Sequence, residues 1–420
     1  MKILVLGAGV VGTTSAWFLA QAEHEVTVVD RQAGAGLETS FANGGQISVS
    51  HAVPWANPAA PATTLRWLLK EDAPLLFRMR LDPLQWRWCL GFLLECMPQR
   101  TAANIKQIVT LGLHSRAVLQ DLRRETGISY DHLEKGILHF YTDHAAFDAA
   151  QAPARLMREQ GCDLRMLTPA EAIAIEPALR HARERIVGAS VAPADESGDA
   201  FKFTRGLANL AAQRGVEFRY ATRVKRLVAS GDAIAGIVVS DNAGQVCALT
   251  ADAYLVALGS FSTALLRPLG VDLLVYPAKG YSVTFPVEYP ELAYSTSLTD
   301  DARKLVFSRL GERLRIAGTA ELGSNDTGLN PVRCDAIVRR TLELFPGIAR
   351  PEKAEFWAGL RPSTPSNVPY IGKTKFRNLY LNTGHGTLGW THACGSAHAI
   401  AEIVSGRDPG IDFAFTGVAR

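Results

Sequence analysis

Short apolar runs and glycine turns alternate at the start of the chain. An apolar strand is predicted over residues 2–6, then a glycine turn, an alanine-rich helix to about residue 22 and a second strand over residues 25–30. Because a strand, a helix and a strand follow one another with short connections, the pattern predicts a βαβ unit at the N-terminus.

The middle of the chain is predicted to contain one helical block followed by mixed elements. Trp, Leu and Arg dominate residues 64–97, and a helical pattern then continues to about residue 125. The elements expected after this block are, in order, a strand at 137–142, a helix at 145–160, a helix from the polar cluster 195–199 to about residue 214, a small β-meander, a strand at 253–258, a strand-rich block at 270–320 and a helix at 331–344.

Signals of a nucleotide-binding fold return near the C-terminus. An apolar strand at 379–382 leads into the glycine-rich segment 384–389, and a last helix follows to about residue 405. Since such units stand at both ends of the chain, the sequence predicts an α/β fold with a discontinuous Rossmann-like domain and a second, α+β domain built on an antiparallel sheet. The expected domains are 1–60, 195–262 and 357–420 for the first, and 61–194 and 263–356 for the second.

Composition and charge are those of an ordinary globular protein. The chain has 420 residues, of which 47% are hydrophobic and 20% charged, so two packed domains with substantial cores are expected. Its 44 Lys and Arg residues against 41 Asp and Glu leave a net charge of +3, too small and too dispersed for a nucleic-acid-binding surface. We therefore expect no nucleic-acid partner.

Cysteine spacing and hydropathy exclude further classes. The six cysteines form neither a C-x-x-C pair nor a cluster at zinc-ligand spacing, so we expect reduced thiols and no metal site. Gly7, Gly9 and Gly12 interrupt the apolar N-terminal run, which argues against a secretory signal peptide. No apolar stretch reaches the length of about 18 residues that a membrane span needs. The sequence predicts a cytoplasmic protein, soluble or peripheral on the inner face of the membrane.

A G-x-G-x-x-G fingerprint lies between the first strand and the first helix. In residues 7–12 (Gly-Ala-Gly-Val-Val-Gly), the glycines allow a tight turn, the approach of a pyrophosphate and close packing of the helix on the strand. The helix N-terminus presents free N–H groups to the phosphates. Asp30 closes the second strand, where its carboxylate can accept hydrogen bonds from an adenosine ribose. The fingerprint does not distinguish NAD from FAD, since both contain ADP.

Two further glycine-rich segments favour a flavin. Residues 39–47 (Thr-Ser-Phe-Ala-Asn-Gly-Gly-Gln-Ile) combine hydroxyls and amides with two glycines soon after Asp30. Residues 384–389 (Gly-His-Gly-Thr-Leu-Gly) end a strand and start a helix, so their N–H groups can meet the negative charge that develops on a flavin ring. Taken alone, this second segment is equally compatible with a structural turn. An NAD enzyme needs only the fingerprint, whereas a cofactor held by both chain ends suits FAD.

The most specific motifs lie outside the fingerprint. They are residues 37–40 (Leu-Glu-Thr-Ser), 43–48 (Asn-Gly-Gly-Gln-Ile-Ser), 276–282 (Tyr-Pro-Ala-Lys-Gly-Tyr-Ser), 359–362 (Gly-Leu-Arg-Pro) and 382–390 (Asn-Thr-Gly-His-Gly-Thr-Leu-Gly-Trp). With these motifs, nearly the full length of the sequence resembles the D-amino-acid dehydrogenases of the D-amino-acid oxidase superfamily. The resemblance implies a noncovalent FAD, the two-domain D-amino-acid oxidase fold, and oxidation of D-amino acids, D-alanine typically among them, to 2-oxo acids and ammonia. It also implies that electrons pass to a respiratory acceptor, the quinone pool.

The chain departs from this resemblance at two places. His51 stands where relatives usually have tyrosine, and Ser366-Asn367 stands where they usually have Asp-Gly. If these positions line the pocket, they alter the preferred substrate side chain and leave the flavin site intact. The predicted FAD contacts are Gly7, Gly9, Val10, Val11, Gly12, Asp30, Arg31, Ser40, Asn43, Gly45, Gln46, Val224, Gly259, Gly384, Gly386, Thr387, Leu388 and Gly389.

Arg361 is the predicted anchor for the substrate carboxylate, because a guanidinium binds a carboxylate in a bidentate manner. The resemblance assigns it this role; outside the motif, a surface salt bridge would be its ordinary use. Tyr276 and Tyr281 are predicted to cover the pocket or hydrogen-bond the carboxylate, with core aromatics as the alternative. His51 is a further predicted substrate contact. We expect His385 beside the flavin and not as a base, because hydride transfer from a neutral amine needs no strong base.

Basic and aromatic side chains alternate in residues 64–97. This pattern predicts either a membrane-interface surface, which would bring the flavin near the quinone pool, or helices that pack on the core of the second domain. Three other functions stay open at this point. They are an amine or glycine oxidase of the same superfamily with oxygen as acceptor, an NAD-dependent dehydrogenase, and a non-catalytic FAD-binding scaffold.

Overall fold

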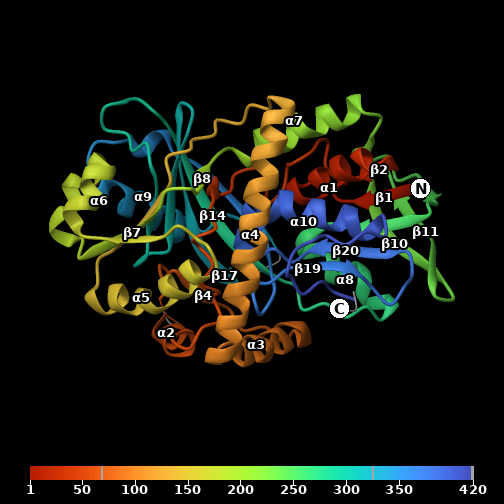
Figure 1. Cartoon of the computed structure of the whole chain (residues 1–420), viewed down its shortest axis with the longest axis horizontal. Coiled ribbons are helices and arrows are strands. Elements are labelled where there is room, and N and C mark those ends of the chain that lie inside the picture. Colours follow the sequence, from red (N-terminus) through yellow and green to blue (C-terminus); the bar gives the residue numbers. More distant parts are fainter. Residues whose placement is uncertain (68–69, 324–325, 418–420) are drawn as a thin grey trace.

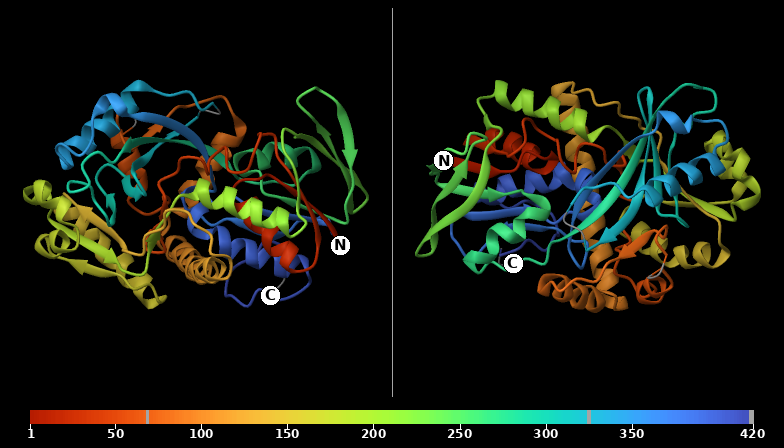
Figure 2. Two further views of the ribbon diagram at one scale, coloured as in Figure 1. Left: turned by 90° about the horizontal axis from the view of Figure 1, so that it is seen from above. Right: turned by 180° about the vertical axis from the view of Figure 1, so that it is seen from behind.

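Two lobes, each built round one large sheet, make up the molecule in the computed structural model (Figure 1). The structure describes residues 1–67, 70–323 and 326–417. The long helix α4 (Pro98–Thr126) lies along the junction between the lobes in each view (Figures 1 and 2). The predicted fold class, an α/β domain with a mixed second domain, is confirmed.

The first sheet joins strands from both ends of the chain. It has six strands, and all neighbouring pairs are parallel except β19 and β20. Helices α1 (Val10–Gln21), α7 (Ala200–Gln213) and α10 (Gly389–Val404) share one core cluster with its buried strands. The predicted meander, β10 (Arg223–Ser230), β11 (Ala233–Ser240) and β12 (Val246–Leu249), packs with α8 (Ser262–Leu266) in a second cluster. In spatial order the six strands are β19 (Tyr370–Lys373), β20 (Leu379–Thr383), β13 (Ala253–Val256), β1 (Lys2–Leu6), β2 (Glu25–Val29) and β9 (Glu217–Arg219).

The second sheet has nine strands, and most neighbouring pairs are antiparallel. Helices α6 (Pro169–Ile175) and α9 (Pro331–Leu344) belong to its core cluster. Strand β18 contains residue 357, the predicted start of the last cofactor-domain segment, and pairs with β14. The domain boundaries stay a prediction. The strands are, in order, β18 (Glu355–Ser363), β14 (Tyr276–Pro286), β17 (Arg313–Leu322), β16 (Leu305–Leu310), β15 (Ser297–Asp300), β5 (Ile137–Tyr141), β7 (Gly188–Ala192) and β6 (Arg165–Leu167), with β4 (Leu75–Phe77) beside β17.

The block at 64–97 is not helical throughout, so the sequence prediction was wrong in its middle. It contains the end of α2 (Ala60–Trp67), then β4, then α3 (Pro83–Glu95). Strand β4 forms because residues 320–322 of β17 offer a free edge, with which it pairs in parallel. The guanidinium of Arg333 also donates to the carbonyl of Glu71 at 2.8 Å, which ties this segment to α9. Leu68 and Leu69 lie outside the described residues.

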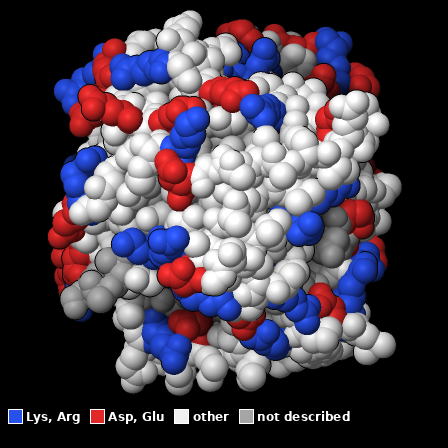
Figure 3. Space-filling view, turned by 90° about the vertical axis from the view of Figure 1, so that its right-hand side faces the viewer, with Lys and Arg blue, Asp and Glu red and all other residues white. Residues whose placement is uncertain are grey.

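Charged side chains of both signs are interspersed on the face that carries the N-terminus and the meander (Figure 3). Within the described residues, no helix is both long enough and apolar enough to cross a membrane. The same part of the chain holds no group of three or more His, Cys, Asp or Glu side chains arranged to bind a metal ion.

Candidate active site

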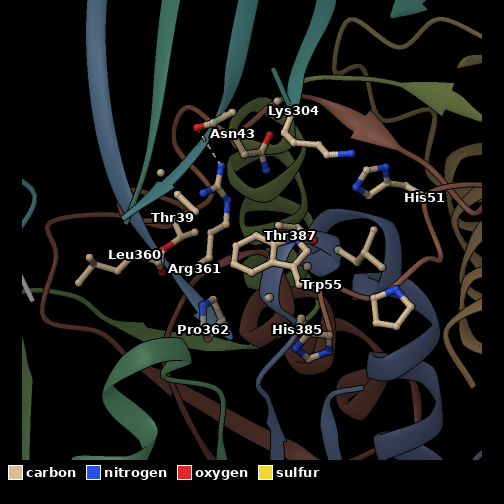
Figure 4. Close-up of a pocket in the computed structure, with 18 of the residues that line it drawn as sticks. Thr39, Asn43, His51, Trp55, Lys304, Leu360, Arg361, Pro362, His385 and Thr387 are labelled. Carbon is tan, nitrogen blue, oxygen red and sulfur yellow. Dashed lines mark hydrogen bonds between the residues drawn. The ribbon is translucent and has the colours of Figure 1, made fainter. Parts of the chain in front are cut away.

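One large cavity, of about 1720 Å³, extends from the first sheet to the second. Residues that follow β1, β2, β13 and β20 line it, at the edge where sheets of this type bind nucleotides. Its other end is lined by residues of β14, β17 and β18 and contains Arg361 (Figure 4). Segments from both ends of the chain therefore meet in one cavity.

The glycines of the fingerprint have distinct roles in the structure. Gly7 turns the chain with a φ of 109°, and a Cβ on Gly12 would lie 1.9 Å from the carbonyl oxygen of Gly7. Gly12 is therefore a packing residue and does not line the cavity. A Cβ on Gly9, in contrast, would meet only the Ser40 hydroxyl, at 3.6 Å, so this backbone faces open space. That space lies at the N-terminus of α1, which suits a pyrophosphate.

Asp30 lies at the end of β2, beside the fingerprint. Its carboxylate accepts hydrogen bonds from the backbone N–H groups of Ala8 at 2.6 Å and Gln32 at 2.7 Å. Burial raises the pKa of Asp30 from its usual range, and these two bonds oppose that shift. The next residue, Arg31, pairs with Glu38 at 2.5 Å and stacks on the ring of Phe261. Sequence reasoning missed the role of Glu38, although it lies in a quoted motif.

The segment at 39–47 anchors the fingerprint to the second sheet. The hydroxyl of Ser40 accepts a hydrogen bond from the N–H of Val10 at 3.0 Å, at the start of α1. The side chain of Asn43 accepts from the N–H of Gly45 at 3.0 Å, and the side chain of Gln46 donates to the hydroxyl of Ser297 at 3.0 Å. Ser40, Asn43, Gly45 and Gln46 all line the cavity, as do Val10 and Val11.

The glycine segment at 384–389 lines the cavity from the other chain end. Gly384 and Gly386 have positive φ values of 85° and 55°, and a short 3-10 helix (Gly386–Leu388) leads directly into α10. The imidazole of His385 lies 3.1 Å from the hydroxyl of Ser396. Burial, with a smaller effect of His392, lowers the pKa of His385 to about 3, so this ring stays neutral at physiological pH. The segment presents a helix N-terminus to the cavity and no charged side chain.

Arg361 lies on β18 and reaches the cavity across Gly280 of the neighbouring strand β14 (Figure 4). Its guanidinium donates to the carbonyls of Thr319 at 2.7 Å and Gly318 at 3.4 Å. Within the described residues, no carboxylate forms an ion pair with it. Desolvation, and then the charge of Arg333, lower the pKa of Arg361 to about 10, which still leaves it protonated. An oriented cation without an acidic partner among the described residues is suited to bind an anionic ligand.

The structure does not bring both predicted tyrosines to this arginine. Tyr276 is not among the residues that line the cavity: it is 2% exposed and packs near Trp88 in a small core cluster, so its role as a substrate contact stays a prediction. Tyr281 borders the cavity, but its buried hydroxyl donates to Glu321 at 2.7 Å. This bond occupies the hydroxyl group that was predicted to meet the substrate.

Other cavity residues complete the site. Val224 and Gly259, both predicted cofactor contacts, line it, and so does His51. Sequence reasoning missed Trp55, His139 and Lys304, which also line it. No local motif marks them, because they come from a loop, a central strand and a hairpin that meet only in the folded chain.

The residues present fit an extended dinucleotide. The open space at Gly9, the acceptor Asp30 and the start of α1 suit the ADP half, and the cavity then continues past the segment at 39–47 to Arg361. A nucleotide cleft that continues into a second sheet in this way defines a two-domain flavin-dependent oxidoreductase. The model of the family described as FAD dependent oxidoreductase matches residues 2–403, so the chain belongs to this family and its cofactor is FAD.

Curated relatives cover the chain almost completely. The protein is 59% identical over 415 residues to a D-amino acid dehydrogenase of Dechloromonas aromatica, with 99% of each chain covered. It is 52% identical over 421 residues to one of Paramagnetospirillum magneticum, covering 100% of this chain and 99% of the relative. The resemblance found from the motifs is therefore confirmed.

Solved structures show the same fold at lower identity. Glycine oxidase from Geobacillus kaustophilus superposes with a TM-score of 0.75 at 23% identity, and 100% of each chain is covered. L-proline dehydrogenase from P. horikoshii gives a TM-score of 0.74 at 18% identity, with 97% of this chain and 96% of that chain covered.

Proposed function

We propose that this protein oxidises D-amino acids, D-alanine among them, to 2-oxo acids and ammonia. The observation that carries the proposal is the oriented guanidinium of Arg361, which faces the cavity without an acidic partner among the described residues. The relatives named D-amino acid dehydrogenases support the substrate class.

In this reaction the chain itself positions the amino acid. Arg361 binds the α-carboxylate, and its bonds to two backbone carbonyls restrict how the guanidinium can turn, so the α-carbon is held in one orientation. FAD supplies the two-electron acceptor for the hydride that leaves this carbon. The amine gives up one proton as the imine forms, and water then converts the imine to the 2-oxo acid and ammonia. A neutral amine needs no strong base for this step, which agrees with the low pKa of His385, about 3, because such an imidazole is a weak proton acceptor.

The first test is the flavin absorbance of the purified holoenzyme, mixed without oxygen with D-alanine and, separately, with L-alanine. We expect bleaching by the D form alone. A yellow protein that no D-amino acid bleaches would overturn the proposal. Rapid peroxide production in air would instead support the alternative, an oxidase of the same superfamily that uses oxygen.

We also propose that electrons pass to the respiratory quinone pool at a membrane surface formed by α2, α3 and residues 70–82. Trp88 is 2% exposed in the core, whereas Trp86 is 49% exposed, so the block at 64–97 has one inward and one outward side. Exposed Arg66, Lys70 and Arg80 accompany the apolar groups and suit an anionic lipid surface. The exposed apolar side chains are Leu65, Met79, Leu81, Trp86, Leu90, Leu93, Leu94 and Met97.

Flotation with anionic liposomes at low salt tests this surface. We expect the wild-type holoenzyme to float and the double variant Leu90→Ser, Leu94→Ser to remain at the bottom of the gradient with its flavin absorbance unchanged. The exposed pair Val246→Ser, Val332→Ser, on other elements, is the matched control and should float. Failure of the wild type to float would overturn the membrane proposal and leave the reaction proposal intact.

A further inference from the structure

Two imidazoles lie in the same cavity as Arg361. His51 follows the short strand β3 (Gln46–Ile47), and His139 lies on β5. Their ring centroids are 5.6 Å apart with an interplanar angle of 34°. Figure 4 shows the ammonium of Lys304 pointing toward His51, away from Arg361. The cavity therefore has a second polar region besides the carboxylate anchor.

The second sheet sets the side chains around His139. Its register partners on the two neighbouring strands are Thr299 of β15 and Ser190 of β7, so the three side chains share one face. All three line the cavity. Gln46, from the segment that anchors the fingerprint, donates to the hydroxyl of Thr299 at 3.3 Å. The row formed by Thr299, His139 and Ser190 is thus connected to the segment at 39–47.

One nitrogen in this region has no hydrogen-bond partner in the part of the chain that the structure describes. His139 is 9% exposed, and within the described residues its Nε2 makes no hydrogen bond. A buried polar nitrogen that is left unpaired destabilises the folded protein, because it has lost its hydrogen bonds to water. Such atoms are rare in folded proteins, and at the wall of a cavity they indicate a missing ligand group.

The region is polar without carrying net charge. Burial lowers the pKa of His51 to about 4 and that of His139 to about 3, with smaller effects of Lys304 on His51 and of His51 and Lys304 on His139, so both rings are neutral at physiological pH. The charge of Lys304 is balanced by Asp301, with which it pairs at 2.6 Å. A charged ligand group would lose its hydration here without gaining a free counter-ion.

We propose that His51 and His139 form the binding site for the substrate side chain, and that this site selects D-amino acids whose side chains end in a neutral hydrogen-bonding group, a carboxamide or a hydroxyl. The inference rests on the proposed function. A neutral imidazole pair both donates and accepts hydrogen bonds, which matches the donor and acceptor of a carboxamide. An alkyl group can form no hydrogen bond with either ring. An apolar isostere would leave Nε2 of His139 unpaired, as it is in the structure.

Three side chains of similar shape test the selection: D-asparagine, D-leucine and D-aspartate. We expect the holoenzyme to show a higher kcat/KM for D-asparagine than for the other two. His139→Leu should reduce the ratio of D-asparagine to D-leucine about fivefold, the effect of one lost neutral hydrogen bond, whereas His139→Gln should retain it. His181→Leu, at an exposed site outside the cavity, is the matched control and should leave the ratio unchanged.

A binding measurement tests the same side-chain selection without turnover. Succinamate and 4-methylpentanoate are asparagine and leucine without the amine, so neither can be oxidised. Their dissociation constants, measured by calorimetry on the holoenzyme, should differ in the same direction as the kcat/KM values and converge in His139→Leu. If that variant does not retain FAD, His51→Leu takes its place.

The two proposals fail in different ways. Equal kcat/KM for D-asparagine and D-leucine in the wild type, or an unchanged ratio in His139→Leu, would overturn the side-chain site alone. A purely structural role of His139 would lower the rates for all three substrates equally and leave the ratio unchanged. A holoenzyme that no D-amino acid reduces would overturn the proposed function and this inference with it.

Discussion

The guanidinium of Arg361 occupies the space that a side chain on Gly280 would need. A Cβ on Gly280 would lie 2.1 Å from Nη1 of Arg361, closer than real atoms approach. The two residues are brought together by the pairing of β14 with β18, where Gly280 lies opposite Gly359. Gly280 is thus required for the position of the arginine, although it has no chemistry of its own.

Gly280→Ala should therefore displace the guanidinium and impair substrate binding more than flavin binding. We expect KM for D-alanine to rise up to roughly a hundredfold, the usual cost of misplacing an anchor by about 1 Å. The measurement is steady-state kinetics together with the flavin content of the purified protein. Gly34→Ala, where a Cβ would meet only a Leu37 methyl group at 3.6 Å, is the control and should behave like the wild type. Equal loss of flavin and of substrate binding in Gly280→Ala would contradict this explanation.

Arg361→Lys keeps the positive charge and removes the planar fork. Because a lysine cannot form two parallel bonds to a carboxylate, we expect KM to rise about tenfold, and more in Arg361→Gln, where the charge is lost as well. Both variants should retain FAD, since the guanidinium bonds only to Thr319 and Gly318 among the described residues. Unchanged KM values in both variants would show that Arg361 does not bind the substrate carboxylate.

Gly9→Ala and Gly12→Ala should separate cofactor binding from folding. A methyl group on residue 9 has room in the protein but enters the space assigned to the pyrophosphate, so this variant should fold and lose FAD. A methyl group on residue 12 would collide with the carbonyl of Gly7 and push α1 from β1, so this variant should lose thermal stability as well. Flavin absorbance and the Tm of the apoproteins provide the two readouts. A Gly9→Ala protein with full flavin content would disprove the assigned role.

Asn367 is one of the residues at which the sequence departs from the D-amino-acid dehydrogenases, and it forms a hydrogen bond with Trp55, which lines the cavity. It has a φ of 62°, in the left-handed region that glycine and asparagine tolerate, and its side chain accepts a hydrogen bond from the N–H of Trp55 at 2.9 Å. Asn367→Gly should lose only this bond, about 1 kcal/mol of stability. Asn367→Ala should lose the bond and add at least about 1 kcal/mol of backbone strain. Tm should fall in the order wild type, Gly variant, Ala variant; the reverse order of the two variants would show that the strain is relieved.

Buried histidines should make stability depend on pH. Burial lowers the pKa of His392 from 6.5 to about 4. Below pH 6.5 the unfolded chain therefore binds a proton that the folded chain cannot bind, and the free energy of unfolding falls by about 1.4 kcal/mol per pH unit for such a group until the folded pKa is reached. In urea titrations between pH 7 and pH 5, His392→Asn should show a shallower slope than the wild type. His181→Asn, at an exposed site, should keep the wild-type slope.

Local patterns were sufficient for much of the fold and of the cofactor site. The strand, glycine turn and helix at the N-terminus, the position of Asp30 directly after β2 and the helix at 331–344 were predicted correctly, because a turn, a strand end or an amphipathic helix depends on neighbours within a few residues. Strand β4 was missed inside a helical pattern, because its partner residues 320–322 lie far along the chain.

The sequence by itself determined the cofactor, FAD, and predicted Arg361 as the carboxylate anchor, because motifs preserve the order of residues around a ligand. Only the tertiary structure decided which side chains meet in the substrate cavity. It removed Tyr276 from the cavity, directed the hydroxyl of Tyr281 to Glu321 and placed His51 beside His139. These contacts depend on the pairing of strands and the packing of loops far apart in sequence, and no local pattern contains that information.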